Sequence, residues 1–253
     1  MVGGPSAWQW LYKPELIDNW KVSCIIDGEA EKVIVEIAER IINDEIPRYV
    51  YVGVEDSPDL NEIPTIKFPS VNGLIEVMRG CPRRCKFCSV TLRKLRHYTF
   101  DMIERDLRVN VEGGVSSGII HSEDVLLYGS NGIRPNPEKL VKLHELVKRY
   151  YKNLAWSHVC LSSVKYAEEE YGLIRKLVEI INQEFIDVEV GIETGSPELA
   201  RKIMPAKAKP YDVEDWPEIV VDAFSIMHGN NIVPAATIIL GLPDETEIDV
   251  IKT

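Results

Sequence analysis

The segment Arg79-Gly80-Cys81-Pro82-Arg83-Arg84-Cys85-Lys86-Phe87-Cys88 contains three of the five cysteines of this 253-residue chain within eight positions. Thiols at spacings of four and three residues can converge on one metal centre from a single loop. A closed structural zinc site and an electron-transfer iron–sulfur cluster each take four protein ligands. Three protein ligands leave one position open, as in a catalytic zinc site. The spacing therefore indicates a metal centre with room for a further ligand.

Two other interpretations of the cysteines stay open. Cysteines at this spacing can line one buried helix face as small apolar residues, although Pro82 and the neighbouring basic residues disfavour a helix here. A zinc site completed by Cys160 or by a distant histidine is the second alternative.

The chain outward from this segment alternates between strand-like and helix-like patterns. Short apolar runs predict strands, and apolar residues at helical spacing predict helices between them. Such alternation favours a parallel sheet covered by helices, an α/β fold. From residue 70 onward we expect strands at Leu74–Met78, Asp124–Tyr128, Trp156–Leu161, Val188–Ile192 and Pro234–Leu240, and helices at Asp101–Glu112, Pro137–Tyr151, Glu168–Glu184 and Val213–Met227.

The first 70 residues have a different organisation. We expect strands at Val22–Ile26 and Arg48–Val54 with a helix at Ala30–Ile42, followed by a proline-containing linker composition over Glu55–Pro69. The last residues look like the start of an interrupted helix, so we expect a piece of a longer protein. The predicted organisation is a first domain over 1–54, a linker over 55–70 and a second domain over 71–253 that ends after its fifth strand.

The cysteine segment resembles the cluster motif of radical S-adenosylmethionine (SAM) enzymes, including the aromatic Phe87 before the last cysteine. The resemblance implies a [4Fe-4S] cluster held by Cys81, Cys85 and Cys88, with SAM on the fourth iron. It implies reductive cleavage of SAM to a 5′-deoxyadenosyl radical that abstracts hydrogen from an unidentified substrate. The implied fold is an incomplete (βα)6-type TIM-like barrel. Phe87 would pack near the adenine, or alternatively form a core aromatic under the loop.

Further SAM-binding residues are expected where barrel strands end, because such folds place their sites at the carboxyl ends of the strands. After the expected second strand, the segment matches the family only in its position along the chain. The resemblance also points to a serine after the third strand and to the segment at the end of the fifth strand. These candidates are Gly129, Ser130, Asn131, Ser162, Ile239 and Gly241.

Glu193 closes the expected fourth strand and is the remaining SAM-binding candidate. By two-residue alternation, Glu189, Gly191 and Glu193 share the strand face that should line the barrel interior. An unpaired buried carboxylate is costly, which favours a functional role for Glu193, and a partner is expected for Glu189.

The N-terminal region resembles the end of a Rossmann-like cobalamin-binding domain, through Gly3-Gly4-Pro5 and Ile26-Asp27-Gly28-Glu29-Ala30-Glu31. The cobalt-ligating Asp-x-His-x-x-Gly motif of that domain is absent, so cobalamin is expected only for a full-length parent. The chain as a whole is similar to archaeal-type iron–sulfur oxidoreductases of the cobalamin-binding subgroup, a group without a characterised reaction.

Composition limits the partners. The net charge of −11, from 29 basic and 40 acidic residues, argues against a large nucleic-acid surface. No apolar run approaches the roughly 20 residues of a membrane-spanning helix, and the expected location is the cytoplasm. We expect a reductant protein of the flavodoxin or ferredoxin type. One basic run keeps open the alternative of a methylthiotransferase or RNA-modifying relative. This run consists of Arg83, Arg84, Lys86, Arg93, Lys94 and Arg96. A non-catalytic binding module stabilised by a metal or cluster is a further alternative.

Overall fold

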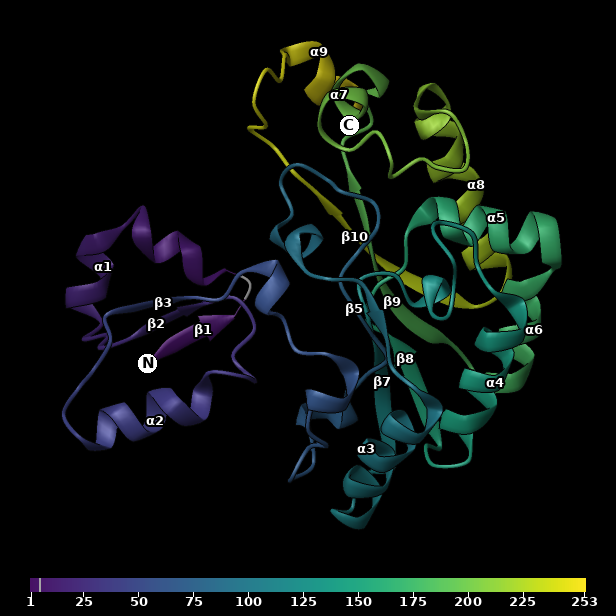
Figure 1. Ribbon diagram of the computed structural model, residues 1–253. Helices are drawn as coiled ribbons and strands as arrows, with labels where there is room; N and C mark the ends of the chain where they lie inside the picture. Colours follow the sequence, from purple (N-terminus) through teal and green to yellow (C-terminus); the bar gives the residue numbers. More distant parts are fainter. Residues whose placement is uncertain (5) are drawn as a thin grey trace. The chain divides into compact units, whose positions relative to one another are not determined.

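The structure, a computed structural model, describes residues 1–4 and 6–253, so Pro5 of the Gly3-Gly4-Pro5 segment lies outside the described residues. The chain forms two compact units (Figure 1). Unit 1 comprises residues 1–64 with 92–94, and unit 2 comprises residues 65–91 with 95–253. In the described part of the chain, no helix is long and apolar enough to cross a membrane.

Unit 1 is built on three short parallel strands in the order β1-β2-β3, with apolar clusters that include both Ile25 and Ile26 of the central strand. Ile25 packs with Ala7, Ile17 and Val22, whereas Ile26 packs with Ile37 of α2. Neighbouring strand residues point to opposite faces, so both faces of the sheet are covered. The elements are β1 Val2–Gly4, α1 Pro14–Asn19, β2 Ile25–Asp27, α2 Ile34–Ile42 and β3 Tyr49–Tyr51, with 3-10 helices at Ala7–Leu11, Val54–Asp56 and Leu60–Glu62.

Unit 2 contains five parallel strands. Strands β4, β7 and β8 pair in that order, and β9 pairs with β10. The two sets join where the backbone N–H of Glu189 on β9 donates to Ser157 and that of Val159 donates to Glu189. The strands are β4 Ile75–Glu76, β7 Ser117–His121, β8 Asn153–Trp156, β9 Ile186–Glu193 and β10 Ile232–Ile238, and β5 Met78–Arg79 forms a small antiparallel pair with β6 Arg96–His97.

Helices α4, α5, α6 and α8 cover one face of these strands (Figure 1). On β9, Val188 and Val190 are buried whereas Asp187 and Glu189 are exposed, as the two-residue alternation predicts. The apolar face thus meets the helices and the acidic face points the other way. The helices are α3 Phe100–Glu112, α4 Pro137–Lys148, α5 Leu161–Tyr171, α6 Leu173–Ile181, α7 Pro197–Ile203, α8 Trp216–Gly229 and α9 Glu247–Lys252.

The expected second strand at Asp124–Tyr128 is wrong. The strand is β7 at Ser117–His121, and Val125–Leu127 is a fully buried 3-10 helix. A short apolar run buried on all sides has the same composition whether it is extended or helical, so periodicity cannot separate the two. Gly129, Ser130 and Asn131 therefore follow a buried turn and not the end of a strand.

Two further boundaries differ from the expectation. The third strand ends at Trp156, so Leu161 begins α5 instead of closing a strand. The helix expected over Glu168–Glu184 is two helices, because Gly172 adopts a left-handed conformation with φ 57° that ends α5 and starts α6. Glycine carries no Cβ penalty there, which makes it a common helix terminator.

Candidate functional site

The three cysteines of the motif lie on one loop that follows β5. Cys85 is buried, Cys81 and Cys88 are half-buried, and all three thiols are free. The loop is tied down by the backbone N–H of Lys86, which donates to the carbonyl of Ile203 at 2.8 Å, and by that of Cys88, which donates to Cys85 at 3.1 Å. Because Glu76 of β4 pairs with His121 of the parallel strand β7, this loop leaves the sheet at the carboxyl end of its strands.

Burial raises the pKa of two of the three thiols. Burial raises the pKa of Cys85 to about 11; the Lys207 ammonium opposes this rise, and the charges of Cys160 and Cys88 add to it. Burial likewise raises the pKa of Cys81 to about 12. A buried thiol gives up its proton readily only when a cation or a metal stabilises the thiolate.

Among the described residues, no three His, Cys, Asp or Glu side chains are arranged to hold a single metal ion. The zinc alternative requires all its ligands to converge on one ion. A four-iron cluster makes a different demand, because each thiolate binds its own iron. Three free thiols on one loop, one buried and two half-buried, fit that donor set.

Arg83, in the middle of the cysteine motif, is buried and hydrogen-bonded throughout. Its Nη2 donates to Ser163 Oγ at 2.6 Å and to Asp124 Oδ2 at 3.3 Å. Its Nη1 donates to three carbonyls in the segment after α7, those of Ala206, Lys207 and Lys209, at 3.2, 2.9 and 3.1 Å. Two members of the basic run, Arg83 and Arg96, are therefore buried and not available to a partner's surface.

Asp124 is the buried counter-charge of Arg83. The carboxylate is fully buried and accepts a 2.7 Å hydrogen bond from Ser163 Oγ. Burial raises the pKa of Asp124, and the Arg83 guanidinium opposes that rise. The second carboxylate oxygen, Oδ1, has no hydrogen-bond partner among the described residues. The pair thus fixes the cysteine loop against the core.

Glu193 ends β9 in a left-handed conformation, with φ 63°, next to a register shift between β9 and β10. Its Oε1 accepts a 2.7 Å hydrogen bond from Lys207 Nζ, and the two side chains are 12% and 11% exposed. Lys207 had no signal in the sequence, because it follows a helix and belongs to no motif. The carboxylate that the sequence marked as functional is therefore paired within the protein.

The structure brings two of the other predicted SAM-binding residues into contact with Glu193 or Lys207. Ile239 donates its backbone N–H to the carbonyl of Glu193 at 2.9 Å, and Ser162 Oγ donates to the carbonyl of Lys207 at 2.6 Å. Ser162 is fully buried in the first turn of α5. Phe87 is 39% exposed, which contradicts its alternative interpretation as a core aromatic.

The remaining predicted residues are held by local contacts. Gly129 donates its backbone N–H to His97 Nδ1 at 3.0 Å, Ser130 Oγ donates to the carbonyl of Gly132, and Asn131 is exposed. The exposed Gly241 donates its N–H to Glu245 Oε2. None of these contacts reaches the cysteine loop.

Sequence reasoning missed a group of histidines at the carboxyl ends of β7 and β8. The rings of His121 and His158 lie 6.1 Å apart edge to face, and His158 Nε2 is 3.6 Å from Glu189 Oε2. Glu189 is half-exposed, so the expectation that it is buried and needs a buried partner is wrong. Correct placement of β7 from the pattern Ser117–His121 would have pointed to His121 at a strand end.

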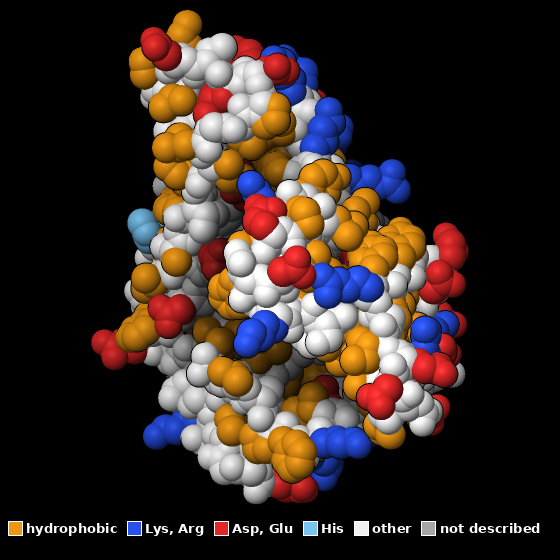
Figure 2. All heavy atoms as spheres, turned by 90° about the vertical axis from the view of Figure 1, so that its left-hand side faces the viewer, with side chains coloured by type: hydrophobic (Ala, Val, Ile, Leu, Met, Phe, Trp, Pro, Cys, Tyr) orange, Lys and Arg blue, Asp and Glu red, His pale blue; other side chains and the backbone are white. Residues whose placement is uncertain are grey.

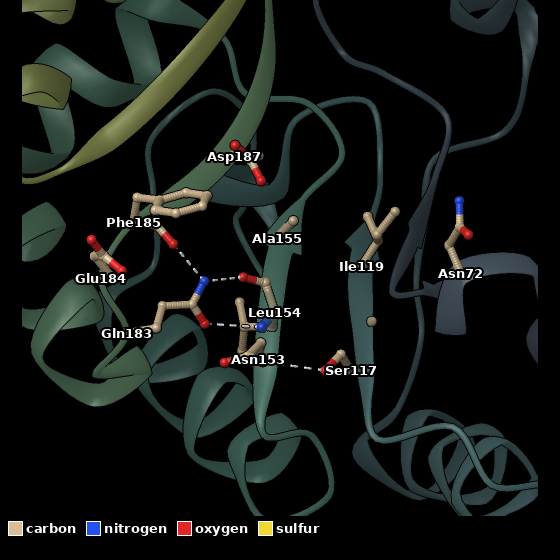
Figure 3. Close-up of a pocket in the computed structure, with 11 residues that line it drawn as sticks. Asn72, Ser117, Ile119, Asn153, Leu154, Ala155, Gln183, Glu184, Phe185 and Asp187 are labelled. Carbon is tan, nitrogen blue, oxygen red and sulfur yellow. Dashed lines mark hydrogen bonds between the residues drawn. The ribbon is translucent and has the colours of Figure 1, made fainter.

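A cavity of about 570 Å³ opens at the amino ends of β7 and β8 (Figure 3). Gln183 borders it and donates from Nε2 to the carbonyls of Leu154 and Phe185, at 2.7 Å each. This end of the strands is opposite to the cysteine loop, and barrel chemistry lies at the carboxyl ends. We therefore do not assign the candidate site to this cavity.

The Lys and Arg side chains visible in Figure 2 are interspersed with acidic and hydrophobic ones. This agrees with the acidic net charge and gives no support to a nucleic-acid surface there.

Comparison with known proteins connects this geometry to a family. The sequence profile of the Radical SAM superfamily matches residues 75–253. An uncharacterised protein of Methanopyrus kandleri is 26% identical over 181 residues, which cover 68% of this chain and 32% of that protein. The ribosomal protein uS12 methylthiotransferase RimO of Bdellovibrio bacteriovorus is 30% identical over 100 residues, covering 39% of this chain and 21% of that protein.

Among solved structures, the cobalamin-dependent SAM radical enzyme OxsB, with aqua-cobalamin and SAM bound, is similar at a TM-score of 0.63 and 14% sequence identity. The match covers 99% of this chain and 38% of the OxsB chain, so this chain spans about a third of the length of both OxsB and the Methanopyrus relative. At this identity the similarity shows the fold, which is the one predicted.

Members of the superfamily are enzymes that use a [4Fe-4S] cluster and SAM and need a reductant. Because the profile spans most of the chain and includes the three-cysteine loop, this protein belongs to the radical SAM superfamily.

Proposed function

We propose that Cys81, Cys85 and Cys88 each bind one iron of a [4Fe-4S] cluster and leave the fourth iron for SAM. The observation that carries the proposal is the placement of three free thiols on one loop at the carboxyl end of the sheet, in a chain of this family. A cluster held by these residues would, once reduced, supply the electron for cleavage of SAM to methionine and a 5′-deoxyadenosyl radical, which would abstract hydrogen from the substrate.

The protein residues around the loop position these groups. Arg83 fixes the loop through its bonds to Asp124 and to the segment 206–209. We assign SAM binding to Glu193 and Ile239, which meet at the ends of β9 and β10, and to the exposed ring of Phe87 beside Cys88. The assignments of Gly129, Ser130, Asn131, Ser162 and Gly241 have weaker support, because their described contacts are local or buried.

The partners follow from this chemistry. We propose a reductant of the flavodoxin or ferredoxin type, because such acidic proteins can approach the exposed Arg84 and Lys86 of the cysteine loop. The five free cysteines favour a reducing compartment, the cytoplasm. Residues 1–54 are proposed as the end of a cobalamin-binding-type domain, 55–70 as the linker and 71–253 as the radical SAM core, with cobalamin only in a longer parent.

The similarity to two RimO sequences supports a second candidate for the whole protein, a methylthiotransferase. The two candidates share the cluster and the cleavage of SAM, and they differ in the group that the substrate receives.

Anaerobic reconstitution of this chain with iron and sulfide tests the proposal. We expect about four irons per chain, a broad visible absorption, and a change in the EPR signal of the reduced cluster when SAM is added. Two results would contradict the proposed function. One is a chain that binds one zinc and no iron, and the other is a reduced cluster whose EPR signal does not change when SAM is added. Detection of 5′-deoxyadenosine after reduction establishes the cleavage step.

A further inference from the structure

A row of polar side chains crosses the open face of the unit 2 sheet, which is the face turned away from helices α4, α5, α6 and α8. Glu189 of β9 pairs in parallel with His158, which follows β8, and His158 Nε2 lies 3.6 Å from Glu189 Oε2. The ring of His158 in turn lies 6.1 Å from that of His121, the last residue of β7. Three neighbouring strands therefore place these groups side by side at one level of the sheet.

The cavity of about 570 Å³ lies on the same strand face, one step toward the amino ends. It is lined by Asp187 of β9, Ala155 of β8 and Ile119 of β7 (Figure 3). Side chains two positions apart on a strand share a face and are separated by about 6.6 Å. Asp187 and Ile119 are thus the nearest same-face neighbours of Glu189 and His121 along their strands. The polar row and the cavity form one surface, which is polar toward the carboxyl ends and partly apolar below.

The two carboxylates of this surface have no strong cation to balance them. In the part of the chain that the structure describes, neither Asp187 nor Glu189 forms an ion pair with a lysine or an arginine. Glu193, further along β9, shows the contrast, because Lys207 Nζ lies 2.7 Å from its Oε1. A neutral imidazole such as that of His158 can donate a hydrogen bond to a carboxylate but does not cancel its charge. The surface therefore attracts positive charge and repels anions.

We propose that Glu189, positioned by His158, binds the ammonium group of a substrate amine, and that Asp187 strengthens the attraction. The inference rests on the radical SAM chemistry proposed above and names the class of its substrate. An ammonium group is a donor with no acceptor, which suits a half-exposed carboxylate. The apolar part of the amine lies against Ile119 and Ala155. The row stands at the carboxyl end of β7, the same end of the sheet from which the cysteine loop leaves.

NMR of the full chain, with ¹³C in its five histidines, tests the proposal with three probes. The probes are n-propylamine, 1-propanol and sodium propionate, at neutral pH and constant ionic strength. They share the propyl chain, so the comparison isolates the charge of the polar group. n-Propylamine, which is protonated under these conditions, should shift the ring signals of His158 in a saturable way, whereas 1-propanol and propionate should not. The signals are assigned with His158→Gln.

Variants of the two carboxylates place the bound ammonium group. Glu189→Gln should weaken the binding of n-propylamine by about tenfold or more, because a direct hydrogen bond to a charged group is lost. Asp187→Asn should weaken it by about threefold, the effect in water of one unit charge about 7 Å away. Glu179→Gln is the matched control, since Glu179 is an exposed glutamate on α6, and should leave the affinity unchanged. Circular dichroism verifies the fold of each variant.

The absence of a saturable shift with n-propylamine overturns the proposal. An equal response to 1-propanol indicates a general polar site, an equal response to propionate indicates an anion site, and either result also overturns it. Unchanged affinity in both carboxylate variants contradicts the placement of the ammonium group. These measurements do not require a cluster. A chain that binds the amine but assembles no four-iron cluster on reconstitution contradicts the proposed function instead, and the two failures are distinguishable.

Discussion

Arg83 Nη1 donates a 2.9 Å hydrogen bond to the carbonyl of Lys207, which lies 124 residues further along the chain. The donor stands between two cysteines of the motif, and the acceptor belongs to the residue whose ammonium pairs with Glu193. One side chain thus joins the candidate cluster loop, the buried carboxylate of Asp124 and the turn after α7. The positions between the cysteines have a structural task of their own.

Removal of the Arg83 side chain should strongly destabilise the protein. Arg83→Ala leaves Asp124 buried without its cation, which costs about 3–5 kcal/mol of unfolding free energy. Arg84→Ala is the control, since the neighbouring side chain is exposed, and should change stability by less than about 0.5 kcal/mol. Urea unfolding of the apo chain, followed by circular dichroism, measures the unfolding free energy of both variants. Equal losses of stability in the two variants would refute the structural role of Arg83.

The cysteines should separate into two groups. Cys81→Ala, Cys85→Ala and Cys88→Ala should each lose the reconstituted cluster, because a missing thiolate leaves one iron without its protein ligand. Cys24→Ala and Cys160→Ala should retain it. The result for Cys160 is the informative one, because its charge reaches Cys81 and Cys85. Iron content after gel filtration gives the answer, and loss of iron only in Cys160→Ala would reassign the ligands.

Glu193→Ala should keep the cluster and weaken SAM binding. Loss of one charged hydrogen bond corresponds to roughly 1.5–3 kcal/mol. Titration of SAM into the reduced variant, followed by EPR, measures the affinity. Unchanged affinity together with an unchanged yield of 5′-deoxyadenosine would show that Glu193 serves only Lys207 and the fold.

Gly191 gives the Glu193–Lys207 pair its space. A Cβ at this position would lie 2.0 Å from Glu193 Oε1 and 2.6 Å from Lys207 Nζ. Gly191→Ala should therefore displace the pair and cost about 1–3 kcal/mol through overpacking. Gly229→Ala, at the end of α8 with open space around it, should be neutral or stabilising. Thermal unfolding of both variants compares them, and a neutral Gly191→Ala would count against the close packing.

His144 should make the protein less stable in acid. Burial lowers its pKa to about 4, and the neutral ring accepts from Trp156 Nε1 at 2.9 Å while Nδ1 bonds the Leu140 carbonyl at 2.7 Å. The unfolded chain takes up a proton near pH 6.5. The stability that this residue contributes is therefore present above pH 6.5 and is lost as the pH falls toward 4, by about 1.4 kcal/mol per pH unit.

Urea unfolding at several pH values measures that slope. His144→Gln should flatten it between pH 6.5 and 4, and the exposed His228 should not matter, so His228→Gln should keep it. A wild-type slope in His144→Gln would assign the acid sensitivity to other groups.

Several elements could be predicted because their signals are local. Strands β9 and β10 and helices α3 and α4 follow from apolar periodicity, and the structure confirms them within a few residues. Strand β7 was missed because Ser117, Gly118 and His121 interrupt its apolar character. The neighbouring Val125–Leu127 segment is more apolar and was mistaken for the strand. Burial on all sides removes the pattern from which conformation is read.

The sequence by itself determined the family, the three candidate ligands and the α/β class, because these depend on residues that are contiguous or evenly spaced along the chain. Only the tertiary structure decided that Arg83 is buried, that Asp124 is its partner, and that Lys207 pairs with Glu193. A lysine after a helix has the same local sequence whether it faces water or a carboxylate. Its partner is set by how the strands and helices pack, and that packing joins residues whose separation in the chain leaves no pattern to detect.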